Sequence, residues 1–165
     1  GVGLGVFAPA RLNKLVLLGT PAGTFVQTPG LAGAWLYEPT VANMRQLMEL
    51  FPYNTALITD ELVQSRFEAS NRPGAQEALR KLLPKPNDEG ETLVKGFPEP
   101  ALQKITAQTL VLHGREDKVV PLECGIRLVQ NIPNADLFVF GQCGHWVQTE
   151  QRTKFIRMVT LFVGE

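Results

Sequence analysis

The sequence predicts an α/β fold in which three parallel strands carry flanking helices and an inserted helical cap. Three short apolar runs, at 14–18, 110–112 and 137–140, are each followed by or end close to a glycine. Such runs are typical of strands that are buried on both faces of a parallel sheet. The segment 20–104, which is largely helical in pattern, is far longer than a simple crossover between two strands needs. We therefore expect this segment to be inserted as a cap.

Composition excludes several classes of protein. The 165 residues suit one domain, and 16 basic and 16 acidic residues cancel, so a nucleic-acid-binding surface is not indicated. No apolar run approaches the roughly 18 residues that a membrane helix needs. Cys124 and Cys143 form no metal-ligand pattern and imply no disulfide framework. We predict no metal, no cofactor and a cytoplasmic location.

Helical periodicity and capping residues place two helices in the cap. Apolar residues at helical spacing predict a helix over 41–51, which Pro39 opens and Pro52 ends. A second helix is expected to begin after Thr59 or Asp60, since either side chain can accept hydrogen bonds from the first free backbone amides of a helix.

The other elements follow from proline, glycine and apolar positions. Loops are expected over 19–30 and 86–99, and further helices over 75–83, 100–105, 122–130 and 150–162. In the last helix the residues expected to face inward are Phe155, Ile156, Val159 and Phe162. Three regions result: 1–19 as a truncated core start with a helix remnant and a strand, 20–104 as the cap and its connections, and 105–165 as the C-terminal core.

An acid and a histidine follow two of the predicted strands. Asp117 comes three residues after Gly114, and His145 comes four residues after Gly141. Functional groups of open α/β sheets collect at the carboxyl ends of the strands, where a carboxylate can orient a histidine base. Alternatively, Asp117 only caps the next helix and His145 only packs in a loop. Their joint occurrence after successive strands favours a catalytic pair.

The two loops resemble those of a known enzyme family. HGREDKVVPL resembles the acid loop and FGQCGHWVQTEQ the histidine loop of α/β-hydrolases, specifically of the meta-cleavage product hydrolases. The segment MRQLMELFPYNTALITDELVQSRFEAS is of the kind that forms this family's cap, and the resemblance covers about 9–162. It implies a partial α/β-hydrolase fold. It also implies hydrolysis of a carbon–carbon bond in a 2-hydroxy-6-oxohexa-2,4-dienoate ring-fission product of aromatic catabolism, by a Ser-His-Asp mechanism without a cofactor.

The same resemblance assigns roles to four residues. It implies that Asp117 is the triad acid and His145 the base, that Arg66 grips the dienoate end of the substrate, and that Trp146 lines the same pocket. The fork of an arginine suits a carboxylate and an adjacent oxygen. The alternatives are that Arg66 is an exposed helix residue and that Trp146 belongs to the core.

Other reactive side chains are given structural roles. Cys143 lies two residues before His145, and we assign it to packing rather than to nucleophilic catalysis. His113 ends a strand and is expected to be structural. Met44 and Met48 lie at helical spacing and are expected to be ordinary apolar lining.

The sequence departs from the family in one respect, because it contains no G-x-S-x-G nucleophile elbow. Its only serines, Ser65 and Ser70, lie in the predicted cap. Either the serine lies upstream of Gly1, which we expect, or the glycine-rich stretch 1–5 is an elbow in which glycine replaces serine. In the first case this chain alone is inactive and would pair with the missing N-terminal portion, and the full-length protein would form a homo-oligomer.

Two other functions compete with carbon–carbon hydrolysis. One is ester hydrolysis on the same fold, and the other is a non-catalytic ligand-binding module that has lost its nucleophile. In every case the expected partner is a small molecule, a dienoate for the enzyme we favour, and not a nucleic acid or a membrane.

Overall fold

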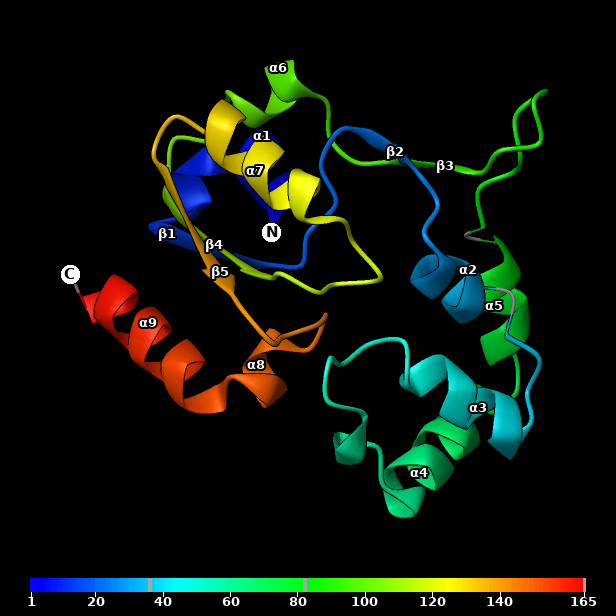
Figure 1. Ribbon diagram of the computed structural model, residues 1–165. Helices are drawn as coiled ribbons and strands as arrows, with labels where there is room; N and C mark the ends of the chain where they lie inside the picture. Colours follow the sequence, from blue (N-terminus) through cyan, green and yellow to red (C-terminus); the bar gives the residue numbers. More distant parts are fainter. Residues whose placement is uncertain (36, 82, 165) are drawn as a thin grey trace.

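A parallel sheet forms the centre of the computed structural model, which describes residues 1–35, 37–81 and 83–164. Its strands are β1 (Lys14–Leu18), β4 (Gln108–Gly114) and β5 (Ala135–Phe140), in the order β1-β4-β5 and all parallel (Figure 1). This confirms the predicted fold class. The register pairs Leu18 with Leu112 and Gly114 with Phe140, so the carboxyl ends of the three strands meet at one edge of the sheet.

Helices cover both faces of the sheet. One face carries α1 (Val2–Phe7), α6 (Glu99–Leu102) and α7 (Leu122–Asn131), and the other carries α8 (Val147–Glu150) and α9 (Arg152–Gly164) (Figure 1). A short 3-10 helix, η1 (Pro9–Arg11), joins α1 to the sheet. No helix in the three described ranges is both long enough and apolar enough to cross a membrane.

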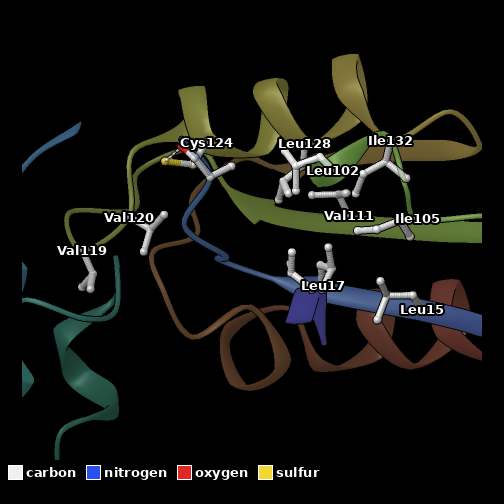
Figure 2. Close-up of a cluster of buried hydrophobic side chains, with 12 residues drawn as sticks. Leu15, Leu17, Leu102, Ile105, Val111, Val119, Val120, Cys124, Leu128 and Ile132 are labelled. Carbon is white, nitrogen blue, oxygen red and sulfur yellow. Dashed lines mark hydrogen bonds between the residues drawn. The ribbon is translucent and has the colours of Figure 1, made fainter. Parts of the chain in front are cut away.

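The larger core lies between the sheet and α7. Leu17 of β1, Val111 of β4 and Leu128 of α7 belong to one cluster of buried side chains (Figure 2). Val111 and Leu128 are completely buried, as is Leu112, which points from the same strand to the opposite face. The central strand β4 is therefore apolar on both faces because both faces are covered, as its uninterrupted apolar run indicated.

A second, antiparallel sheet joins the two ends of the segment between β1 and β4. It pairs β2 (Thr24–Val26) with β3 (Leu93–Lys95), and α2 (Pro29–Trp35) follows β2. The prediction of loops over 19–30 and 86–99 was wrong for β2 and β3, and the first two residues of α2 lie within the first range. Each strand is only three residues long and pairs with a partner far away in the sequence, so no local pattern reveals it.

The helices of this segment are α3 (Val41–Met48), η2 (Thr55–Leu57), α4 (Asp60–Ser70) and α5 (Ala75–Lys81). The Thr59 hydroxyl accepts a hydrogen bond from the amide of Leu62, which confirms the predicted start of α4. The predicted helix 41–51 is shorter than expected, and Thr40 rather than Pro39 caps it. The predicted third helix, 75–83, includes residue 82, which lies outside the described residues. The division of the chain at residues 19 and 104 stays a proposal.

The C-terminal helix differs from the prediction in one side chain. The helix expected over 150–162 is α9, and the short helix α8 ends just before it, at Glu150. Phe155, Val159 and Phe162 pack on the core, but Ile156 is 49% exposed. The inward residues are spaced by three and four positions, and Ile156 is out of phase with that stripe.

Candidate active site

The acid loop holds Asp117 by one of its two carboxylate oxygens. Oδ1 accepts hydrogen bonds from the amides of Val119 (2.8 Å) and Val120 (2.9 Å). The next helix, α7, begins only at Leu122, after Pro121, and has no side-chain cap. Asp117 therefore closes its own turn and does not cap the helix, which was the alternative interpretation. Its second oxygen, Oδ2, is left to face another loop.

The histidine loop is held through its backbone by three different elements. The amides of residues 143, 144 and 145 donate in turn to Glu116 Oε2 (3.0 Å), Glu150 Oε1 (2.8 Å) and the carbonyl oxygen of Phe51 (2.7 Å). Glu116 belongs to the acid loop, Glu150 ends α8, and Phe51 follows α3. The acid loop and the cap thus fix the backbone from which His145 projects.

Asp117 and His145 form a hydrogen-bonded pair. Asp117 Oδ2 lies 2.8 Å from His145 Nδ1, and the Asp117 side chain is fully buried whereas that of His145 is 25% exposed. A carboxylate can only accept, so Nδ1 carries the proton and the lone pair lies on Nε2. Within the described residues nothing hydrogen bonds to Nε2. The pair therefore has the arrangement of a base and its orienting acid.

Gly19 follows β1 directly and lies against this pair, so the end of the third strand also borders the site. Its φ of +45° is left-handed, and a Cβ at this position would lie 2.9 Å from His145 Nδ1 and 3.3 Å from Asp117 Oδ2. The sequence marked this residue only as a glycine that ends a strand. Its place against the imidazole depends on the register of β1 on β4, which the sequence does not reveal.

Arg66 and Trp146 line one pocket beside the pair. This pocket, of about 680 Å³, lies between α3, α4 and the start of α8, and Met44 and Met48 contribute to its wall. Trp146 is half-buried and stacks on the ring of Phe51, with 5.6 Å between ring centroids and 21° between planes. The alternative view of Arg66 holds in part, because this arginine is exposed on α4.

The structure thus brings the four predicted residues together as two groups rather than one. Asp117 and His145 form the hydrogen-bonded pair, and Arg66 and Trp146 line the pocket. The ring of Phe51 joins them, because its centroid lies 5.8 Å from that of His145 as well as against Trp146. Sequence reasoning missed Phe51, because the sequence pattern marks it only as the last apolar position of the helix expected over 41–51.

The remaining reactive groups lie outside the Asp117–His145 pair, although Ser70 lines the same pocket as Arg66. His113 is fully buried, and its Nε2 bonds to the carbonyl oxygen of Val120 at 3.0 Å. Ser65 and Ser70 both lie on α4, where the Ser70 hydroxyl donates to the carbonyl oxygen of Phe67. In the described part of the chain, no group of three or more His, Cys, Asp and Glu side chains could hold a metal ion.

Replacing Gly19 with alanine is expected to displace the His145 ring, because the methyl would meet it at 2.9 Å. The left-handed backbone adds about 1 kcal/mol of strain. Gly74→Ala is the matched control, since Gly74 has a φ of +80° and no atom within 4 Å of an added Cβ. In proton magnetic resonance, Gly19→Ala should weaken the signal of the His145 Nδ1 proton and Gly74→Ala should not. An unchanged signal in both variants contradicts this placement.

Cys143 is expected to resist alkylation in the folded chain. Burial first, and then the negative charges of Glu150, Asp117 and Glu116, raise the pKa of its thiol to about 12. Because the thiolate is the reactive form, iodoacetamide at about pH 8 should modify Cys143 only after unfolding, when the pKa returns to its ordinary value. Peptide mass spectrometry measures the modification. Rapid labelling of Cys143 in the folded chain would show that the thiol is accessible and ionised.

Two curated hydrolases share much of this sequence. The chain is 44% identical over 163 residues to the 2-hydroxymuconate semialdehyde hydrolase of Pseudomonas putida, covering 98% of this chain and 57% of that protein. It is also 44% identical over 156 residues to the 2-hydroxy-6-oxo-2,4-heptadienoate hydrolase of Pseudomonas putida strain F1, covering 94% and 56%. The chain therefore spans little more than half the length of these relatives.

Solved structures and the family pattern agree with this similarity. A meta-cleavage product hydrolase from Pseudomonas fluorescens IP01 superposes with a TM-score of 0.89 at 38% identity, over 99% of this chain and 60% of that one. For the 2-hydroxy-6-oxo-6-phenylhexa-2,4-dienoate hydrolase of Rhodococcus sp. strain RHA1 the TM-score is 0.82 at 28% identity, over 99% and 59%. The pattern of the alpha/beta hydrolase fold matches residues 5–151. The chain belongs to the alpha/beta hydrolase fold family.

Proposed function

We propose that these residues carry the acid, the base and the cap of a hydrolase that cleaves a carbon–carbon bond in a 2-hydroxy-6-oxohexa-2,4-dienoate ring-fission product. The observation that carries the proposal is the 2.8 Å hydrogen bond between His145 Nδ1 and Asp117 Oδ2, beside a pocket lined by Arg66. The names of the relatives at 44% identity support the substrate class. The proposal also places the protein in the cytoplasm, which fits the free thiols of Cys124 and Cys143.

In this proposal His145 moves protons and Asp117 keeps it in the correct tautomer. The dienol substrate first tautomerises to a ketone. His145 Nε2 then accepts the proton of the attacking nucleophile as it adds to the distal carbonyl, and buried Asp117 stabilises the imidazolium. Cleavage of the carbon–carbon bond and addition of one water yield a 2-hydroxypentadienoate and a carboxylic acid.

The pocket supplies recognition of the dienoate end. The guanidinium of Arg66 can bind a carboxylate and an adjacent oxygen through two parallel hydrogen bonds. The faces of Trp146 and Phe51 and the side chains of Met44 and Met48 give an apolar wall for the conjugated chain. One charged residue and a few polar ones among mainly apolar neighbours is the usual composition of a small-molecule pocket.

The nucleophilic serine of the proposed triad lies outside these 165 residues. Ser65 and Ser70 lie on α4 and neither follows a strand. A glycine elbow over residues 1–5 has little support, because a Cβ on Gly3, its central residue, would meet Phe97 rather than His145. The chain alone is then inactive and acts together with the segment that bears the serine, in a protein that forms a homo-oligomer.

The substrate class is tested with a form of the protein that includes the nucleophile. We expect 2-hydroxy-6-oxo-2,4-heptadienoate to be cleaved with a higher kcat/KM than p-nitrophenyl acetate, and the 165-residue chain alone to turn over neither. Asp117→Asn should lower kcat by roughly 10³- to 10⁴-fold, because the imidazole loses its tautomer and its counter-charge. Absorbance of the dienol and of the nitrophenolate measures both reactions.

Each other outcome points to a competing function. Faster ester turnover would identify an esterase. Substrate binding without turnover of either compound, in the longer form, would identify a ligand-binding module. Turnover by the 165-residue chain at the rate of the longer form would place the nucleophile within it.

The role of Arg66 is tested by whether its replacement changes KM or kcat. Arg66→Gln should raise KM for the dienoate by roughly 10- to 100-fold, the cost of one or two charge-assisted hydrogen bonds, and Arg66→Lys by less. Arg72, which is exposed just beyond the end of α4, provides the control variant Arg72→Gln. Steady-state kinetics give both constants. An unchanged KM in Arg66→Gln would show that Arg66 does not bind the substrate and is an ordinary surface residue.

A further inference from the structure

Glu150, the last residue of α8, joins two segments that are far apart in the sequence. Its Oε2 accepts hydrogen bonds from the amides of Tyr53 (2.7 Å) and Asn54 (3.3 Å), which follow α3 in the cap. Its Oε1 accepts the amide of Gly144 at 2.8 Å, next to His145 in the histidine loop. One half-buried carboxylate therefore satisfies three backbone donors from two segments.

The two segments lie directly on one another. A Cβ on Gly144 would come within 2.3 Å of the carbonyl oxygen of Phe51 and 2.8 Å of the amide of Tyr53. Only glycine allows the chains to approach so closely. The amide of His145 completes the contact by donating to the same Phe51 carbonyl oxygen at 2.7 Å.

The cap side of this contact continues into the pocket wall. Residues 51–54 begin three positions after the end of α3, whose Met44 and Met48 line the pocket. The ring of Phe51 lies against both Trp146 and His145. Figure 1 shows the loop after α3 running toward α8, away from the α3–α4 pair. A movement of α3 therefore reaches the imidazole through residues 51–54.

We propose that Glu150 is a positioning residue that ties the cap to the histidine loop, so that the position of α3 sets the position of the His145 imidazole. The carboxylate is suited to this because it has acceptors for both segments at once. A glutamine keeps one acceptor oxygen and must release one segment, and if the two segments are coupled the segment that stays bonded is loosened as well. The consequence for catalysis rests on the proposed function, whereas the coupling of the two segments does not.

The coupling is tested in the 165-residue chain by magnetic resonance, without turnover. Glu150→Gln should speed hydrogen exchange at the amides of Tyr53 and Gly144 by about 10-fold or more, and should weaken the signal of the His145 Nδ1 proton. Exchange at the amide of Leu128, in the core, should stay unchanged and serves as the reference for global stability.

Two further variants make the test specific. Glu123→Gln, an exposed acid in the first turn of α7, is the matched control and should alter none of these signals. Glu150→Asp keeps the charge but shortens the reach by one methylene group. It should change the same signals in the same direction, which keeps the test decisive if the glutamine variant does not fold.

Several outcomes overturn the proposal. Faster exchange at only one of the two amides, or an unchanged His145 signal, shows that Glu150 does not couple the segments. Equal acceleration at the Leu128 amide shows that the residue only stabilises the fold. In the form that includes the nucleophile, Glu150→Gln should also lower kcat by roughly 10-fold. If the Glu150 variants do not show these magnetic-resonance effects, the coupling is disproved. If they show the effects but the longer form does not hydrolyse the carbon–carbon bond, only the proposed function is disproved.

Discussion

The hydrogen bond between Asp117 Oδ2 and His145 Nδ1 depends on most of the structure around it. It forms because β4 and β5 are parallel neighbours whose register brings their carboxyl ends level. Burial of the carboxylate keeps water away from it and strengthens its interaction with the imidazole. Gly19, at the end of β1, closes the third side. A change of register by one residue between β4 and β5 would separate the acid from the base, and the same change between β1 and β4 would move Gly19 away from them.

The cap takes part in the same arrangement because it contacts both loops. The Thr28 hydroxyl, before α2, donates to the carbonyl oxygen of Val119 in the acid loop at 2.7 Å. On the other side, residues 51–54 lie on the histidine loop and share the carboxylate of Glu150 with it. Through these contacts, the segment between β1 and β4 helps to fix the positions of both loops. Each of its two attachments ends within two residues of a member of the pair.

The parts of the fold and site that follow from local patterns were predictable from the sequence. The three strands stand out because their apolar runs end near glycines, and α4 because Thr59 caps it. Asp117 and His145 follow from their positions after two of these strands. Gly19, Phe51 and Glu150 could not be found in this way, because their partners are distant in the sequence and a carboxylate that accepts backbone amides leaves no pattern. The β2–β3 pair was missed because its two strands pair across a long stretch of sequence. Ile156 was misplaced because it is out of phase with the buried stripe of its helix.

For the proposed hydrolase, the absence of free space at Gly19 and Gly144 has a consequence for how new substrates could be acquired. Neither position can accept even a methyl group without pushing against the imidazole or the backbone of the cap. A pocket residue that could vary without meeting the imidazole or the histidine loop is one on α4, such as Leu62. Diversification of substrate range, by evolution or in a mutant library, is therefore directed toward α4. The loops of the sheet edge would be inherited almost unchanged.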